Sequence, residues 1–381
     1  MARSAARKRI KSKVAAHTGK NFSGQVVLVL QGGGALGAYQ VGVYEALHEA
    51  GIEPQWVIGT SIGAINGAII AGNPPEERMD KLNAFWGLVG SRQYDSLGAK
   101  WSVFANTMGN AGTYVNGIKG FFAPNPLAAW GVHNPLGVER AAYYSTEPLR
   151  ESLSRLIDVD YINAKHGRLT LGAVGVGTGK MHYFDSRDEP LDVRHVMASG
   201  ALPPAFPAVR IGGEAYWDGG IYSNTPIEVV LDDKPRRDSL IFSANVWHPL
   251  GPEPETIWQV LGRQKDIQFA SRTHSHIVRQ QQIHRLRHIV RDLAQYIPAA
   301  RKKDQDIMEM LAYGCATVMH IVPLMAPRIE GEDHTKDIDF SCSGIEARRK
   351  AGYADTKRQI DLAPWTEPCD ELDGVIIHGD A

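Results

Sequence analysis

The stretch LVLQGGGALGAYQVG, residues 28–42, joins an apolar run to three consecutive glycines and then to an amphipathic segment. The apolar run 26–30 shows no polar alternation, which predicts a strand that is buried on both faces of a sheet. After the glycines, apolar side chains recur at helical spacing: Tyr39, Val43 and Leu47. A second buried run, 56–60, follows, so this part of the chain predicts a strand–helix–strand unit with parallel strands.

Similar apolar runs recur further along the chain, at 169–176, 240–246 and 317–325. Each has the length of a strand and is too continuous for a half-exposed sheet. The fold class is therefore α/β, with a mainly parallel central sheet that helices cover. We expect a main domain over residues 21–250 and a largely helical C-terminal extension over residues 251–381.

The extension contains one long segment with helical spacing, residues 263–297. Its expected apolar face consists of Leu286, Ile289, Val290, Leu293 and Ile297. From Arg263 to Arg291 the segment carries seven Lys or Arg against one acid, so its polar face is basic. We expect that face to be solvated, and contact with an anionic surface is the alternative.

Composition describes a soluble globular protein, with 43% hydrophobic and 22% charged residues in 381 positions. The formal net charge of -1 argues against a nucleic-acid partner for the chain as a whole. Residues 1–20 hold seven Lys or Arg and no acid, which predicts a disordered basic arm or, alternatively, a weak tether to anionic lipid. Three widely spaced cysteines, without a CxxC pair, fit a reduced cytoplasmic compartment: Cys315, Cys342 and Cys369.

Residues 91–144 form an insert with little helical or strand periodicity, rich in Gly, Asn, Pro and aromatic residues. Loops of this length are uncommon and often serve as lids or binding segments. Six aromatic side chains are available to cover a lipid-like substrate: Trp101, Phe104, Tyr114, Phe121, Phe122 and Trp130. The alternative is that these side chains pack onto the main core.

The glycine loop itself fits two kinds of anion site. Gly32, Gly34 and Gly37 satisfy G-x-G-x-x-G between a strand and a helix, where a dinucleotide fold holds its pyrophosphate. That fold also needs an acid at the end of the second strand. Here the second strand ends in Ser61, and Glu53 precedes the strand, so the nucleotide interpretation lacks its discriminating residue.

The residues that replace the acid point to acyl transfer. Gly59, Thr60, Ser61, Ile62 and Gly63 form G-x-S-x-G between a strand and a helical run, the setting of a nucleophilic serine in a sharp turn. Ends of adjacent parallel strands meet at one edge of a sheet, so the amides of Gly33 and Gly34 can face the oxygen that becomes negative when Ser61 attacks an ester.

A serine hydroxyl needs a base, and Asp218 in EAYWDGGIYSNTP is the strongest candidate. The two glycines that follow Asp218 leave its carboxylate uncrowded. Asp-Gly is also a common turn signal, so a purely structural Asx-turn is the local alternative.

Together, the GGGxxG loop, Ser61 in G-x-S-x-G, the segment 198–220 and Asp218-Gly-Gly resemble the patatin-like acyl hydrolases over about residues 25–246. The resemblance implies a three-layer α/β/α fold, a Ser61–Asp218 dyad without histidine, and no metal or organic cofactor. It implies an oxyanion hole built by the glycine motif: Gly32, Gly33, Gly34 and Gly37. The extension resembles one found on bacterial members.

One position departs from the family pattern. The family loop often has Arg or Lys before its last glycine, where this chain has Leu36. The resemblance therefore does not carry over a preference for phosphate-bearing lipids. The expected partner is a lipid or other acyl ester, with peripheral contact to an anionic membrane or granule surface as a further possibility.

Three rivals remain open at this point. An α/β-hydrolase with a Ser-His-Asp triad would use His248, which follows the strand 240–246. A non-catalytic protein of lipid or storage-granule surfaces would account for the basic arm and the aromatic insert. A metal site would rest on His284 and His288, which are four residues apart but lack a third ligand.

Overall fold

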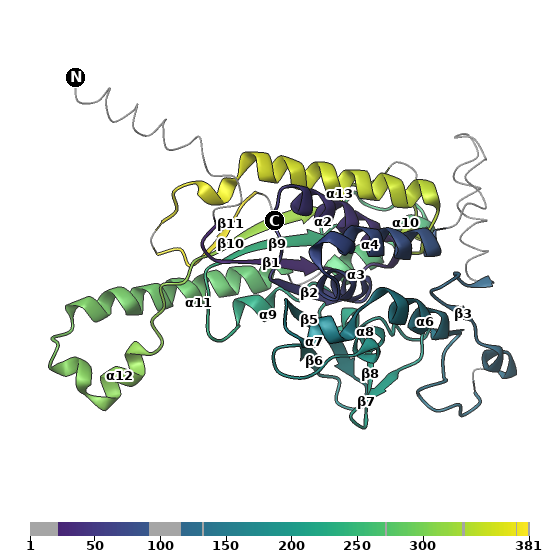
Figure 1. The fold of residues 1–381 in the computed structure, drawn as a ribbon, viewed down its shortest axis with the longest axis horizontal. Helices are drawn as coiled ribbons and strands as arrows, with labels where there is room; N and C mark the ends of the chain where they lie inside the picture. The colour runs from purple at the N-terminus through teal and green to yellow at the C-terminus, as the bar shows by residue number, and fades with distance from the viewer. Residues whose placement is uncertain are drawn as a thin grey trace, which may run out of the picture.

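A nine-stranded mixed sheet lies at the centre of the described part of the protein (Figure 1). The computed structural model describes residues 22–90, 116–131, 133–270, 273–329, 332–370 and 372–379. The expected basic arm, residues 1–20, lies outside these ranges. Among the described residues, no helix combines the length and the apolar character that crossing a membrane requires.

The strands stand in the spatial order β11–β10–β9–β1–β2–β5–β8–β7, and β6 also pairs with β5. The first six strands of this order are parallel: β11 (Val375–Ile377), β10 (Met319–Met325), β9 (Ser239–Asn245), β1 (Gln25–Leu30), β2 (Trp56–Thr60) and β5 (Arg168–Gly175). Three further strands form the antiparallel end: β6 (Met181–Asp185), β8 (Glu214–Asp218) and β7 (Val209–Ile211). The expected mainly parallel sheet is thus confirmed, including the five strands that the apolar runs predicted.

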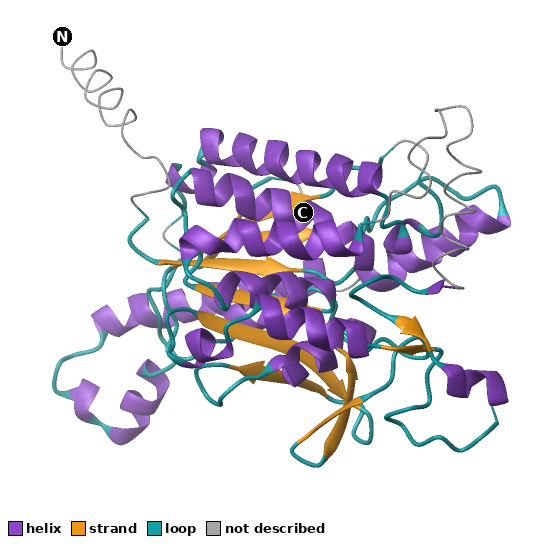
Figure 2. Ribbon diagram, turned by 45° about the vertical axis from the view of Figure 1, so that its right-hand side comes forward, coloured by secondary structure: helices purple, strands orange, loops and turns teal. Residues whose placement is uncertain are grey.

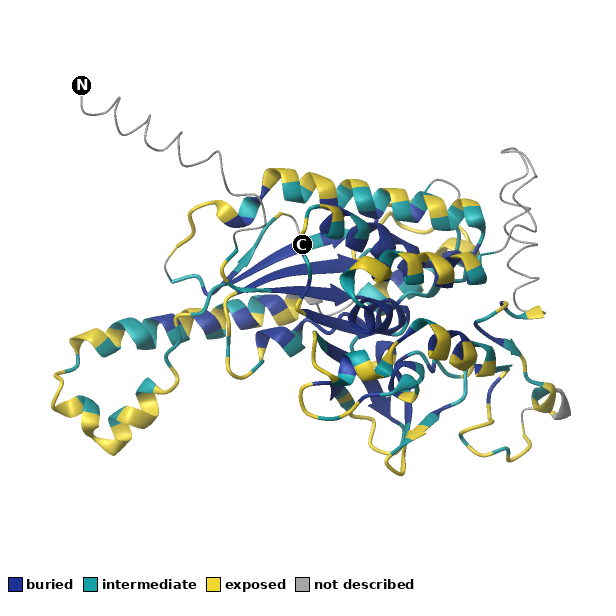
Figure 3. Cartoon of the chain, in the orientation of Figure 1, coloured by how far each residue is buried: buried dark blue, intermediate teal, exposed yellow. Residues whose placement is uncertain are grey.

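Helices cover both faces of this sheet, which makes three layers (Figure 2). Side chains of β1 alternate between two apolar clusters, with Leu28 and Leu30 on one face and Val27 and Val29 on the other. The first face packs against α2 (Ala38–Glu49), α3 (Ile62–Ala71), α4 (Pro75–Val89) and α13 (Cys342–Leu362). The second packs against α9 (Glu228–Leu231) and α11 (Thr273–Leu293). The central parallel strands β9, β1, β2 and β5 are accordingly almost completely buried, as Figure 3 shows.

Smaller elements complete the described chain. The helices among them are α6 (Glu147–Leu156), α7 (Val159–Asn163), α8 (Val193–Ser199), α10 (Ile257–Ala270) and α12 (Gln305–Leu311). A two-stranded ribbon joins β3 (Ala123–Pro124) and β4 (Tyr144–Ser145).

The C-terminal extension is largely helical, as expected, but it also supplies β10 and β11 to the common sheet. Its last helix, α13, crosses α2 at very short range. A Cβ atom on Gly352 would stand 2.0 Å from the carbonyl oxygen of Tyr39, and one on Gly42 would stand 1.9 Å from that of Arg349. Only glycine permits this approach, so the extension is packed tightly onto the rest of the chain. A division of the chain at residue 250 stays a prediction.

The apolar face predicted for the segment 263–297 is wrong for two of its five residues. The segment contains the end of α10 and all of α11, and Leu286 and Leu293 on α11 are exposed by 62% and 57%. The other three, Ile289, Val290 and Ile297, are partly buried. The buried side chains of α11 are instead Ile277, Gln280, His284 and His288. The reason is the position of the helix: its first part packs on α9 and β11, and its second part projects beyond the sheet toward α12 (Figure 1).

Phe121 and Phe122 of the insert 91–144 are buried in the main apolar cluster. The expectation that these rings pack onto the core therefore holds for both. The other aromatic side chains predicted as a cap, those of Trp101, Phe104, Tyr114 and Trp130, lie outside the described residues or have no described side chain.

Candidate active site

Ser61 occupies the sharp turn between β2 and α3, with φ 57° and ψ −125°. A non-glycine residue with positive φ is strained, and such strain concentrates at functional sites. The two glycines of the motif permit the turn because Cβ atoms at Gly59 and Gly63 would stand 2.3 and 2.2 Å from the carbonyl oxygens of Gly63 and Leu30. The turn leaves Ser61 at the first residue before a helix, where the backbone dipole favours negative charge.

A second serine holds this turn in place. The amide of Ser61 donates hydrogen bonds of 3.1 Å to the carbonyl oxygen and the hydroxyl of Ser199, which ends α8. The Ser199 hydroxyl in turn donates to the carbonyl of Gly172 in β5, at 2.6 Å. The nucleophile candidate is thereby fixed against two neighbouring elements.

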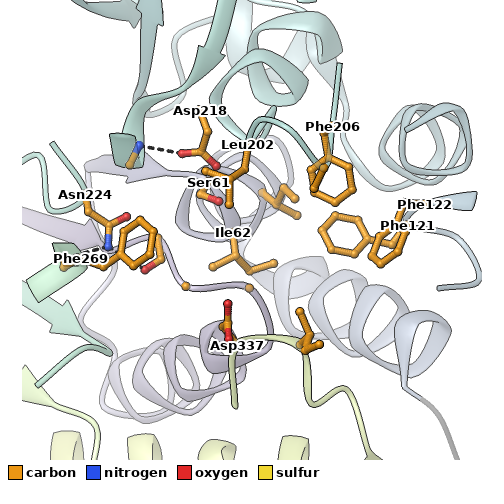
Figure 4. Close-up of a pocket in the computed structure, with 18 of the residues that line it drawn as sticks. Ser61, Ile62, Phe121, Phe122, Leu202, Phe206, Asp218, Asn224, Phe269 and Asp337 are labelled. Carbon is orange, nitrogen blue, oxygen red and sulfur yellow. Dashed lines mark hydrogen bonds between the residues drawn. The ribbon is translucent and has the colours of Figure 1, made fainter. Parts of the chain in front are cut away.

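Asp218 ends β8 and is 1% exposed. Its carboxylate accepts a 2.7 Å hydrogen bond from the Gly220 amide, which is the expected Asx-turn. The Ser61 side chain faces the same carboxylate on the cavity wall (Figure 4). Burial raises the pKa of Asp218 to about 7, and the Ser61 hydroxyl and the Gly220 amide oppose that rise. The local interpretation of Asp218 as an Asx-turn residue is confirmed, and its role as a base stays a prediction.

The glycine loop lies beside this pair. The Gly32 carbonyl oxygen accepts hydrogen bonds from the side-chain amide of Asn224 at 3.0 Å and from the Trp247 indole at 2.8 Å. The backbone amide of Gly32 donates to the backbone carbonyl of Asn224 at 3.1 Å. Within the described ranges, no acceptor contacts the amides of Gly33 and Gly34. These two amides are therefore available to a ligand, whereas the Gly32 amide is already bonded.

One cavity of about 150 Å³ brings Ser61, Asp218 and three of the four predicted loop glycines together. Gly37 is not on its wall and packs against Ile62 instead. Most of the wall is apolar, and one side of it carries contacting aromatic rings: Phe121, Phe122, Tyr144, Phe206 and Phe340. Such a wall fits an acyl chain.

The sequence analysis missed the contribution of the extension to this cavity. Four of its residues line the wall: Phe269 from α10, and Asp337, Ile338 and Phe340 from the segment before α13. The Asp337 carboxylate accepts hydrogen bonds of 2.7 and 3.0 Å from Lys265. These residues follow Ser61 by more than 200 positions and belong to no motif, so no local signal marks them.

The histidines considered from the sequence do not reach the cavity. None of its described wall residues is a histidine. Burial and the neighbouring Arg328 and Lys336 lower the pKa of His248, which lies among residues of the extension. His284 and His288 are buried under β11, where the His288 ring bonds the Thr317 carbonyl at 3.0 Å. The described chain contains no cluster of His, Cys, Asp or Glu able to hold a metal ion.

The structure thus describes an α/β protein in which a serine in a strand-to-helix turn, a buried aspartate and a glycine loop share one cavity. Comparison with known proteins specifies the family. The profile described as Patatin-like phospholipase matches residues 28–231, and one described as Patatin phospholipase matches residues 267–372. The first match alone covers more than half of the chain. The chain therefore belongs to the patatin-like phospholipase family.

Individual relatives match over shorter stretches. Lysophospholipase nte1 of Aspergillus terreus is 43% identical over 86 residues, which is 22% of this chain and 6% of that protein. Triacylglycerol lipase ptl3 of Schizosaccharomyces pombe is 38% identical over 66 residues, 17% of this chain and 14% of that protein. VipD from Legionella pneumophila aligns in structure with a TM-score of 0.41 and 14% identity, over 90% of this chain and 67% of that one. The matched segments span only a small part of the curated relatives.

Proposed function

We propose that this protein is a serine acyl hydrolase that cleaves lipid or other carboxylic esters. Ser61 is the nucleophile and Asp218 is its general base. The observation that carries the proposal is the placement of the Ser61 side chain beside the buried Asp218 carboxylate, on the wall of an apolar cavity (Figure 4). No histidine takes part.

In the first half-reaction, Asp218 accepts the hydroxyl proton as Ser61 Oγ attacks the ester carbonyl carbon. The carbonyl oxygen becomes negative, and the amides of Gly33 and Gly34 donate to it. One such donor contributes about 2.7–4 kcal/mol in the transition state. The C–O bond of the ester then breaks, and protonated Asp218 returns the proton to the departing alcohol.

In the second half-reaction, Asp218 takes a proton from water, which attacks the acyl-serine. The acid leaves and Ser61 recovers its proton. The raised pKa of Asp218 suits both directions of transfer, because a group with a pKa near the working pH can accept and return a proton.

The test compares hydrolysis of p-nitrophenyl butyrate by the wild type, Ser61→Ala and Asp218→Asn. We expect both variants to lose at least about 1,000-fold in kcat, as removal of a triad member does in serine hydrolases. Ser154→Ala is the matched control, because Ser154 is an exposed serine on α6 whose hydroxyl bonds only its own helix. A fluorophosphonate should label Ser61 in the wild type.

Equal activity of wild type and Ser61→Ala would refute the nucleophile. If the wild type is inert and Ser61 takes no label, the remaining candidate is a non-catalytic protein of lipid or granule surfaces. Contact with an anionic membrane or granule surface and a cytoplasmic location stay predictions.

A further inference from the structure

The charged residues on the described wall of the cavity are acidic. Among the wall residues that the structure describes, they are Asp218 and Asp337, and none is Lys, Arg or His. The glycine loop adds no cation either, because Leu36 is buried and stands where the family pattern often has a basic residue. On the part of the wall that the structure describes, a substrate therefore meets carboxyl groups and no positive side chain.

Asp337 stands close to the place where an ester would react. Its carbonyl oxygen lies 2.2 Å from the position that a Cβ atom on Gly34 would take. Its side chain is on the opposite side of the cavity from Asp218 in Figure 4. In the proposed reaction the carbonyl oxygen faces the glycine loop; with the acyl chain against the aromatic wall, the alcohol portion would lie on the Asp337 side of the cavity.

The nearby lysines are already bonded and stand behind the wall. Lys265 donates to both carboxylate oxygens of Asp337 and, at 2.9 Å, to the carbonyl of His334. Lys336 donates to the buried Asp266 at 2.6 Å. A phosphate in the cavity would have to displace a carboxylate to reach either ammonium group.

We infer that the site accepts esters of uncharged alcohols, such as acylglycerols, and that Asp337 discriminates against alcohols that carry phosphate. This inference rests on the proposed hydrolase function and names its substrate class. The physical reason is that Asp337 already occupies Lys265, so a phosphate in this partly buried site meets a carboxylate and finds no free cation on the described wall to compensate its lost hydration. Asp337 is thus a specificity-determining residue.

The experiment uses soluble esters that share one acyl chain: 1-octanoyl-glycerol, 1-octanoyl-glycerol 3-phosphate and octanoylcholine, each below its micelle concentration. For the wild type we expect kcat/KM to favour the neutral ester over the phosphate ester at least about tenfold. Asp337→Asn should raise the relative kcat/KM of the phosphate ester and lower that of the cationic choline ester. A change in cavity shape alone would not move the two charged esters in opposite directions.

Asp361→Asn is the control, since Asp361 is an exposed acid on α13 and the substitution changes the net charge equally. It should leave both ratios unchanged. Added salt should reduce the wild-type preference, because screening weakens the repulsion, and this measurement needs no variant.

A wild type that hydrolyses the phosphate ester as well as the neutral ester would overturn the inference, as would a preference insensitive to both salt and Asp337→Asn. Such a result is separate from failure of the hydrolase proposal, in which Ser61→Ala would retain p-nitrophenyl butyrate hydrolysis.

Discussion

Asp218 combines a structural position with a proposed chemical role. As a turn residue it accepts a hydrogen bond from the Gly220 amide, and as a candidate base it lies beside Ser61 on the cavity wall. Its backbone pairs with Ala173 of β5, so the carboxylate cannot withdraw from the cavity without disturbing the sheet. As a result, Asp218 is a buried carboxyl group, and the folded state disfavours its ionised form.

That consequence predicts a pH dependence of activity and stability. Burial raises the pKa of Asp218 from 3.8 to about 7, so the rate of ester hydrolysis should fall below pH about 7, approaching tenfold per pH unit.

The same shift predicts a pH dependence of stability. Between the two pKa values the native state retains a proton that the unfolded chain loses, so the stabilisation by protonated Asp218 is full below pH 3.8 and disappears as pH rises through about 7. From pH 4 to pH 8 the unfolding free energy of the wild type should therefore fall by roughly 2–4 kcal/mol more than that of Asp218→Asn, which has no group that titrates at this position. Urea unfolding at both pH values checks this, and a constant difference would contradict the buried-carboxyl argument.

Ser199 gives a second prediction at the same scale. Ser199→Ala removes the hydroxyl that links Ser61 to Gly172, so the turn loses one of its two anchors. We expect a loss of about 0.5–1.5 kcal/mol in unfolding free energy and a fall of about tenfold in kcat, with KM little changed. Steady-state kinetics on p-nitrophenyl butyrate measures the split. A raised KM with unchanged kcat would mean that Ser199 shapes the cavity rather than positioning Ser61.

Elements that depend on local sequence patterns could be predicted from the sequence, whereas features that depend on long-range contacts could not. The strands β1, β2, β5, β9 and β10 could be predicted because apolar runs bury both faces of a strand wherever it lies. The strand-to-helix turn at Ser61 could be predicted because its two glycines and its serine form a short contiguous motif between a strand and a helix. The buried face of α11 could not, because neighbouring elements decide which side of a helix is covered. For the same reason nothing local marked Asp337 or Phe269 as wall residues.

The crossing of α2 and α13 provides a prediction about packing. Gly352→Ala would place a methyl group 2.0 Å from the Tyr39 carbonyl, so the helices must separate, and we expect a loss of roughly 1–3 kcal/mol. Gly87→Ala is the matched control in α4, where nothing lies within 4 Å of the added carbon. It should gain roughly 0.5–1 kcal/mol from helix propensity. Denaturant unfolding of the two variants should show shifts of opposite sign, and equal shifts would contradict the tight crossing.

For the whole molecule, the decisive feature is that the sheet continues across residue 250. β9 pairs with β1 on one side and with β10 of the extension on the other. The same extension supplies Phe269, Asp337 and Phe340 to the cavity. Fold and candidate site therefore depend on both parts of the chain.

A fragment that ends at residue 250 should consequently fail to form a native state. It would lose β10, β11 and α13, leaving β9 as an exposed apolar edge, which favours aggregation. Near-ultraviolet circular dichroism and limited proteolysis of the fragment, beside the full chain, test the expectation. A soluble fragment with cooperative unfolding and esterase activity would show that the first 250 residues are a self-sufficient domain.

Trp247 has a consequence for how binding can be observed. Its indole lines the cavity, donates to Gly32 and stacks near Phe269, so it touches the glycine loop and the extension together. Indole emission is sensitive to the polarity of its surroundings and to nearby charge, and Lys336 lies 5.2 Å from this ring. The protein thus carries an intrinsic fluorophore at the junction of its two parts, and the difference spectrum against Trp247→Phe isolates that signal without a chemical label.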